Sequence, residues 1–284
     1  MYLKLSINVP SVYLTFKNVL RTLSTSAALR VKEEKINVKN WNINYVKVGN
    51  GSHNILFLPG ALGTIWTEGK LQIEGFNRDK FTLVTWDPPG YGKSRPPEKN
   101  FSTDFYEQDA DMAFEFMKVL GISKYSVMGF SDGGITGMIH AAKYPEKMHK
   151  LVVWGANSFI LPHELEMYKK IRDVSAWSKR QRDPLTEIYG EKLLPKYWAS
   201  WTDTMAIYKE KNGNICSELL KDIKCPTFIL YGEKDPLVDC VHVSHLHTNI
   251  EGSRIHLYPE GKHHIHLRYA EDFNKRVQDF LTMV

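Results

Sequence analysis

Residues 127–134 read Val-Met-Gly-Phe-Ser-Asp-Gly-Gly and contain a Gly-x-Ser-x-Gly pattern centred on Ser131. This pattern is typical of a nucleophile elbow, a sharp turn between a strand and a helix that exposes a serine side chain. A short apolar run at 125–128 comes before it, and a helix-compatible stretch follows and stops at Pro145. The pattern alone is common by chance, but this context favours the elbow over an incidental serine in a glycine-rich turn.

Apolar runs that are typical of strands alternate with helical patterns along most of the chain. Strands are expected at Lys35–Val38, Ile43–Val48, His53–Leu58, Phe81–Trp86, Leu151–Trp154, Thr227–Tyr231 and Arg254–Tyr258. Helices are expected at Phe105–Leu120, after Ser131, between the strands Thr227–Tyr231 and Arg254–Tyr258, and at about Arg268–Leu281. The first two strands form a hairpin, and the later alternation predicts an α/β fold with a mostly parallel central sheet flanked by helices.

The stretch 158–222 breaks this alternation, because it contains no strong strand pattern. It holds helical segments with Trp177, Trp198 and Trp201, separated by prolines. We therefore predict a core made of residues 33–157 and 223–284, with residues 158–222 inserted as a helical cap. The tryptophans either line a substrate pocket or pack between the cap helices, and the sequence leaves both interpretations open.

The N-terminal stretch, residues 1–32, differs in composition from the rest of the chain. It contains no acidic residue. Its five basic residues, which account for the whole formal net charge of +5, are Lys4, Lys17, Arg21, Arg30 and Lys32. Basic, Ser/Thr-rich and acid-free composition predicts a mitochondrial transit peptide, with a disordered basic tail of a cytosolic protein as the alternative. Because the remaining chain is formally neutral, no nucleic-acid partner is expected.

Cysteine and histidine usage predicts neither a disulfide framework nor a metal site. The three cysteines, at 216, 225 and 240, are odd in number and lack zinc-type spacing, which fits a reducing compartment. The C-terminal third is rich in histidine, but no cysteine or acid completes a recognisable ligand set. No apolar run is long enough for a transmembrane helix. We expect no metal, no cofactor and no membrane partner.

The order of polar residues after the late strands predicts a catalytic triad. A serine nucleophile needs a general base, and the base needs an acid that orients it. In an α/β-hydrolase these residues follow in the order serine, acid, histidine, at the carboxyl ends of strands. Asp235 and His263 follow the last two expected strands in this order. Glu233 competes with Asp235 as the acid, and His264 and His266 compete with His263 as the base.

Two backbone amides are expected to form the oxyanion hole. The residue after the nucleophile, Asp132, supplies one N–H group, and the loop after His53–Leu58 supplies the other, with Ala61 as the best candidate. Two such fixed donors stabilise the transition state by roughly 3 kcal/mol each.

The side chain of Asp132 is unexpected beside an oxyanion hole. Its negative charge could simply stabilise the start of its helix by interacting with the exposed N–H groups there. However, a carboxylate at ~5 Å opposes the developing negative charge by about 3 kcal/mol at an effective dielectric of ~20. A cationic substrate would cancel this penalty, and the ammonium of an α-amino acid ester lies close to the scissile carbonyl. We therefore predict that Asp132 binds a substrate α-ammonium group.

Several longer runs resemble one family. They are residues 86–97 (Trp-Asp-Pro-Pro-Gly-Tyr-Gly-Lys-Ser-Arg-Pro-Pro), 129–135 (Gly-Phe-Ser-Asp-Gly-Gly-Ile), 154–157 (Trp-Gly-Ala-Asn), 232–238 (Gly-Glu-Lys-Asp-Pro-Leu-Val) and 259–263 (Pro-Glu-Gly-Lys-His). From about Lys35 to its end the chain resembles the valacyclovir hydrolase, or biphenyl hydrolase-like, family of α/β-hydrolases. One departure is Phe130, which stands where the family has tryptophan.

The resemblance implies a mitochondrial serine hydrolase of α-amino acid esters, including nucleoside prodrugs, and a link to homocysteine thiolactone hydrolysis. The family's triad carries onto Ser131, Asp235 and His263, and its ammonium-binding aspartate onto Asp132. The glycine two residues before His263 resembles the usual ending of this fold and favours His263 over His264. We expect a monomer that acts on a small-molecule ester.

Two other functions remain as alternatives to the esterase. A carbon–carbon bond hydrolase of aromatic ring-cleavage products uses the same fold and triad, but Asp132 would repel its acidic substrates. A catalytically inactive hydrolase-fold binding protein would not need the serine, acid and histidine that this chain carries.

Overall fold

The computed structural model describes residues 31–208 and 212–283, and the chain from Glu33 onward forms one compact unit. The predicted transit peptide lies almost entirely outside the described residues and stays a prediction. Within the described part of the chain, no helix has the length and apolar character needed to cross a bilayer.

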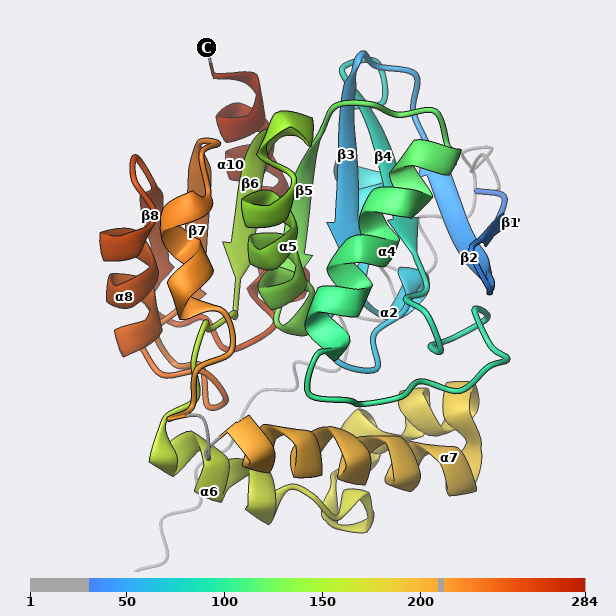
Figure 1. Ribbon diagram of the computed structural model, residues 1–284, viewed down its shortest axis with the longest axis vertical. Coiled ribbons are helices and arrows are strands. Elements are labelled where there is room, and N and C mark those ends of the chain that lie inside the picture. The colour runs from blue at the N-terminus through green and yellow to red at the C-terminus, as the bar shows by residue number, and fades with distance from the viewer. Residues whose placement is uncertain (1–30, 209–211, 284) are drawn as a thin grey trace, which may run out of the picture. The chain divides into compact units, whose positions relative to one another are not determined.

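The unit is built on an eight-stranded sheet with the order β1-β2-β4-β3-β5-β6-β7-β8 (Figure 1). The strands are β1 (Glu34–Val38), β2 (Trp41–Val48), β3 (His53–Leu58), β4 (Phe81–Trp86), β5 (Tyr125–Phe130), β6 (Met148–Trp154), β7 (Thr227–Gly232) and β8 (Arg254–Tyr258). Strands β1 and β2 pair antiparallel, as do β2 and β4, and every later pair is parallel. The predicted fold class is confirmed.

Burial along the strands follows their place in the sheet. Every residue of β4, β5 and β7 is buried, because helices cover both faces of the sheet interior. The edge strands β1 and β8 are largely exposed. Helices α4 (Phe105–Val119) and α5 (Asp132–Lys143) lie on one face, and α10 (Ala270–Thr282) lies on the other (Figure 1).

Short helices account for the differences from the expected elements. Helices α2 (Ile65–Glu68) and α3 (Lys70–Gly75) lie between β3 and β4, where no helix was expected. The last expected helix, 268–281, corresponds to α10, and the short helix α9 (Ile265–Arg268) comes before it, separated by the non-helical backbone angles of Tyr269. Helix α8 (Val241–Asn249) lies between β7 and β8, where a helix was expected.

The segment between β6 and β7 is mainly helical, and its helices lie across the carboxyl ends of the strands (Figure 1). Its helices are α6 (Pro162–Lys170) and α7 (Lys179–Tyr208), with 3-10 turns at Val174–Ala176 and Ser217–Asp222. Gly190, with φ of 74°, divides α7 into two parts. This segment covers the edge of the sheet where the residues after β3, β5, β7 and β8 meet.

The cap tryptophans have two different environments. The ring centroids of Trp177 and Trp198 lie 4.8 Å apart, and both indole N–H groups donate to the Ile171 carbonyl. Trp201 stacks on Trp198 at 4.9 Å, but its indole N–H donates to the Asp132 carboxylate in the core. Trp177 and Trp198 therefore stabilise the cap, whereas Trp201 connects the cap to the site beneath it.

Candidate active site

Ser131 lies on a strained turn between β5 and α5. Its φ of 52° and ψ of −120° fall in a region that costs a non-glycine residue of the order of 1–3 kcal/mol. Glycine is required on both sides because the backbones nearly touch. A Cβ atom on Gly133 would lie 2.1 Å from the Leu58 carbonyl oxygen, and one on Gly129 would lie 2.3 Å from the Gly133 oxygen. The turn holds the serine hydroxyl at the carboxyl edge of the sheet.

A histidine and an aspartate complete a hydrogen-bonded chain with this serine. The Ser131 hydroxyl donates to Nε2 of His263 over 3.2 Å, and Nδ1–H of His263 donates to Oδ2 of Asp235 over 2.7 Å. The histidine and aspartate side chains are only 8% and 1% exposed. A carboxylate accepts but does not donate, which assigns the Nδ1–H tautomer and leaves Nε2 free to accept the serine proton. This is the geometry of a serine nucleophile, its base and an orienting acid.

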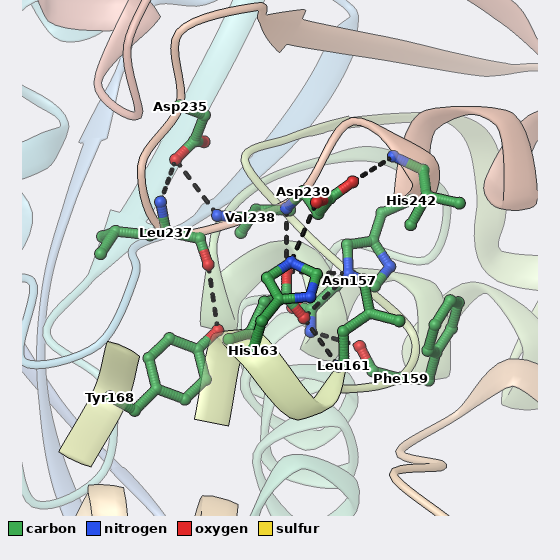
Figure 2. A network of polar contacts seen from close by, with 12 residues as sticks. Asn157, Phe159, Leu161, His163, Tyr168, Asp235, Leu237, Val238, Asp239 and His242 are labelled. Atoms are coloured by element: carbon green, nitrogen blue, oxygen red, sulfur yellow. Dashed lines mark hydrogen bonds and ion pairs between the residues drawn. The ribbon is translucent and has the colours of Figure 1, made fainter. Parts of the chain in front are cut away.

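The loop that carries Asp235 is held by the cap (Figure 2). The backbone N–H groups of Leu237 and Val238 donate to Oδ1 of Asp235 at 2.8 and 3.3 Å. Tyr168 of α6 donates to the Leu237 carbonyl at 3.3 Å. These contacts leave Oδ2 of Asp235 directed at His263, so the acid has one orientation.

Glu164 of α6 also connects this loop to the cap through several hydrogen bonds. Its buried carboxylate accepts hydrogen bonds from the backbone N–H groups of Leu161 and Asp239, each at 2.8 Å, and from Nε2 of His242 at 3.0 Å. Glu164 could not be identified from the sequence, because nothing in its local sequence distinguishes it from a surface glutamate at a helix start.

The competing acid and bases lie elsewhere. Glu233 is exposed. Nε2 of His264 lies 3.9 Å from Glu68, and the side chain is half exposed. His266 is buried, with Nδ1 accepting from the Trp154 indole N–H at 2.9 Å and Nε2 facing Glu68 at 3.1 Å. Burial lowers the pKa of His266 to about 3, so this ring is neutral and structural. The geometry places Asp235 and His263 beside the serine.

The loop after β3 passes directly over Ser131. A Cβ atom on Gly60 would lie 3.1 Å from the Ser131 Cβ, which puts the neighbouring Ala61 at the site. Tyr189 of α7 donates to the carbonyl of Leu62 at 2.8 Å and so holds this loop from the cap. The arrangement is compatible with the expected oxyanion donors, the N–H groups of Ala61 and Asp132, on either side of the serine.

Asp132 is a buried carboxylate at the first position of α5. Its Oδ1 accepts from the Tyr106 hydroxyl of α4, and its Oδ2 accepts from the Trp201 indole of α7, each at 2.8 Å. Burial raises the pKa of Asp132 to about 6, although the hydrogen bonds from Tyr106 and Trp201 act in the opposite direction. The carboxylate is thus held by core and cap together, and it still has lone pairs for a cation. Neither partner could be identified from the sequence, because both lie on distant helices.

The histidine-rich part of the chain does not form a recognisable metal site. Among the described residues, no group of three or more His, Cys, Asp or Glu side chains is arranged to hold a metal ion. His242 faces Glu164, and all three cysteines are free thiols.

Comparison with known proteins identifies the family of the chain. Residues 53–173 match the family model described as alpha/beta hydrolase fold. The chain is 47% identical to the protein named "Serine hydrolase BPHL" of Mus musculus over 252 residues, covering 88% of this chain and 87% of that protein. The identically named protein of Homo sapiens is 46% identical over the same length.

More distant relatives share the fold. A 2-hydroxy-6-oxononadienedioate/2-hydroxy-6-oxononatrienedioate hydrolase of Pseudomonas putida is 24% identical, covering 91% of this chain and 97% of that protein. The crystal structure of a meta-cleavage product hydrolase from Pseudomonas fluorescens IP01 superposes with a TM-score of 0.72 at 19% identity, covering 88% of this chain and 97% of the other. At this identity the match shows the fold alone.

The resemblance seen in the sequence motifs is therefore confirmed over nearly the whole chain. The level of identity and the coverage of both partners exceed what a shared fold alone would require. The chain is an enzyme of the α/β-hydrolase fold and belongs to the serine hydrolase BPHL, or biphenyl hydrolase-like, family.

Proposed function

We propose that this serine hydrolase cleaves α-amino acid esters through an acyl-enzyme intermediate. Ser131 acts as the nucleophile, His263 as the general base and acid, and Asp235 as the residue that orients the histidine. The observation that carries the substrate class is the buried carboxylate of Asp132, directly after the nucleophile.

The hydrogen-bonded chain accounts for each proton transfer. As the Ser131 oxygen attacks the ester carbonyl, its proton moves to Nε2 of His263, and Asp235 stabilises the resulting imidazolium. The carbonyl oxygen becomes an oxyanion between the N–H groups of Ala61 and Asp132. The intermediate then expels the alcohol, which takes the proton from His263. A water molecule, deprotonated by His263, hydrolyses the acyl-enzyme and regenerates the serine.

The Asp132 side chain makes this site unfavourable for most esters. Its negative charge lies next to the position where the oxyanion forms, at a cost of about 3 kcal/mol for ~5 Å and an effective dielectric of ~20. An α-ammonium group, which is attached to the carbon beside the scissile carbonyl, reverses the sign of this effect. Because Tyr106 and Trp201 fix both oxygens of the carboxylate, the ammonium meets a charge that is already oriented.

The same charge argues against the carbon–carbon bond hydrolase. The dioate substrates named for the distant Pseudomonas putida relative are dianions, which a buried carboxylate would repel. The likeness to that protein rests on the fold, and a shared fold does not imply a shared substrate.

A matched pair of esters tests the proposal. We expect the enzyme to prefer valine benzyl ester over its N-acetyl derivative, and Asp132→Asn to reduce this preference by about 100-fold, equivalent to about 3 kcal/mol. Asparagine keeps the volume and removes the charge, so the N-acetyl ester serves as the internal control for folding. Equal rates of the wild-type enzyme on both esters would show that Asp132 only begins a helix.

The preference should also depend on pH. Because the pKa of Asp132 is raised to about 6, the carboxylate loses its charge as the pH falls through this value. The α-amino group of the substrate loses its charge above roughly pH 8. We expect the ratio of kcat/KM values for the two esters to be highest between these limits and to be flat for Asp132→Asn. The ratio cancels the titration of the triad, which affects both esters, so a ratio that stays constant from about pH 5 to 7 would contradict this role.

A further inference from the structure

A buried ion pair lies close to Asp132 and has no part in the mechanism above. Nζ of Lys99 contacts both carboxylate oxygens of Asp109, and the two side chains are only 5% and 13% exposed. The ammonium also lies 5.5 Å from the ring centroids of Tyr91 and Phe105. Buried ion pairs seldom stabilise a protein more than apolar residues of the same volume, so stability alone does not explain this one.

The ion pair and Asp132 are neighbours. Asp109 and Asp132 line the same cavity of about 20 Å³, with walls from Trp86, Tyr91 and Phe105. A cavity of this size has room for about one water molecule. Helix α4 connects the two carboxylates as well, because Tyr106 binds Asp132 and Asp109, three residues later on the same face, binds Lys99.

The net charge of Lys99, Asp109 and Asp132 together determines whether the site attracts a cationic ligand. Burial raises the pKa of Asp109, and the positive charge of Lys99 opposes that rise. As an ion pair, the two side chains have no net charge. Burial is the main cause of the raised pKa of Asp132; the Asp109 carboxylate raises it further and the Lys99 ammonium lowers it. With the pair intact, the buried group carries one net negative charge, on Asp132.

We propose that Asp109 is a specificity-determining residue that neutralises Lys99 and thereby keeps the net negative charge of the Asp132 site available to a substrate ammonium group. This inference rests on the proposed function. Without the Asp109 charge, Lys99 becomes the counter-ion of Asp132, the site becomes neutral, and an ammonium substrate loses its advantage although every residue that touches it is unchanged.

Two variants break the same ion pair with opposite consequences for the charge. Asp109→Asn leaves Lys99 unpaired, so the site loses its net negative charge. Lys99→Met removes the cation instead, so the site keeps the negative charge of Asp132, while burial without a counter-ion raises the pKa of Asp109. The double variant Asp109→Asn with Lys99→Met leaves Asp132 as the only charge. Loss of the ion pair is common to all three, and only the charge distinguishes them.

The measurement is the ratio of kcat/KM for valine benzyl ester and its N-acetyl derivative at pH 7. We expect Asp109→Asn to lower this ratio at least about tenfold, the effect of one unit charge within roughly 10 Å at an effective dielectric of ~20. Lys99→Met and the double variant should not lower the ratio by more than about threefold, because the negative charge of Asp132 stays uncompensated in both. Circular dichroism and thermal unfolding report whether each variant folds, and Asp109→Ser replaces Asp109→Asn if the latter does not.

The outcomes distinguish failure of this inference from failure of the proposed function. If Asp109→Asn and Lys99→Met lower the ratio equally, the ion pair has only a structural role, and the inference is overturned. A ratio that Asp109→Asn leaves unchanged overturns it as well, while the Asp132→Asn result still stands. If the wild-type enzyme shows no preference for the free amine, the proposed function fails, and this inference fails with it.

Discussion

Ser131→Ala is expected to lower kcat by about 10⁶-fold, the effect of removing a nucleophile that works as a unit with its base. The variant has no oxygen to attack the ester or to form the acyl-enzyme, so the residual rate comes from the oxyanion donors and binding alone. The helix and strand around the turn are unchanged, because alanine removes a single atom. Steady-state hydrolysis and covalent labelling with a fluorophosphonate probe both measure this loss.

A second serine–histidine contact provides a matched control. The buried Ser126 on β5, the strand before Ser131, lies 2.8 Å from Nε2 of His53, but it lies within the strand, at an irregularity of the β5–β6 pairing, and not on the strained turn. We expect Ser126→Ala to keep probe labelling and activity, while Ser131→Ala loses both. Labelling that persists in Ser131→Ala would place the nucleophile elsewhere and would contradict the proposed mechanism.

Asp235→Asn is expected to lower kcat by about 10⁴-fold. The Asp235 carboxylate accepts the Nδ1–H group of His263 and holds the ring so that Nε2 faces Ser131. An asparagine can donate to Nδ1 instead, which moves the ring proton to Nε2 and removes the acceptor that the serine needs. The loss should therefore appear in kcat. KM should change little, because asparagine conserves the size of the side chain.

Glu233→Gln is the comparison for this variant. Glu233 lies two residues before Asp235 in the same loop, but it is exposed. We expect a change within about twofold, because an exposed charge is screened by solvent. A larger loss in Glu233→Gln than in Asp235→Asn would reverse the assignment of the acid.

Several strands were predictable to the residue. The expected ranges His53–Leu58, Phe81–Trp86 and Arg254–Tyr258 are the ranges of β3, β4 and β8. The first two are continuous apolar runs that end at turn residues, and a run of this length fits a strand better than a helix. Helices α2 and α3 were not predicted, because four and six residues are too few to show a helical period.

The position of the reactive serine is also a local property. In a nucleophile elbow the serine has a positive φ and lies between two glycines that let strand and helix approach closely, so the Gly-x-Ser-x-Gly pattern predicts this geometry. The order of the polar residues after β7 and β8 follows from the topology of a parallel sheet. Their chain positions therefore indicated the serine, the acid loop and the histidine loop before any contact was known.

The sequence alone thus determined the fold class, the turn that carries Ser131 and the two loops that meet it. Only the tertiary structure decided which of three histidines within four residues faces the serine, since neighbouring side chains point in different directions. It also decided that Glu164 and Trp201 reach from the cap to the acid loop and to Asp132, and that Lys99 pairs with Asp109 beside them. These contacts join segments that are far apart in the chain, so they depend on how the cap and core pack, which no local pattern records.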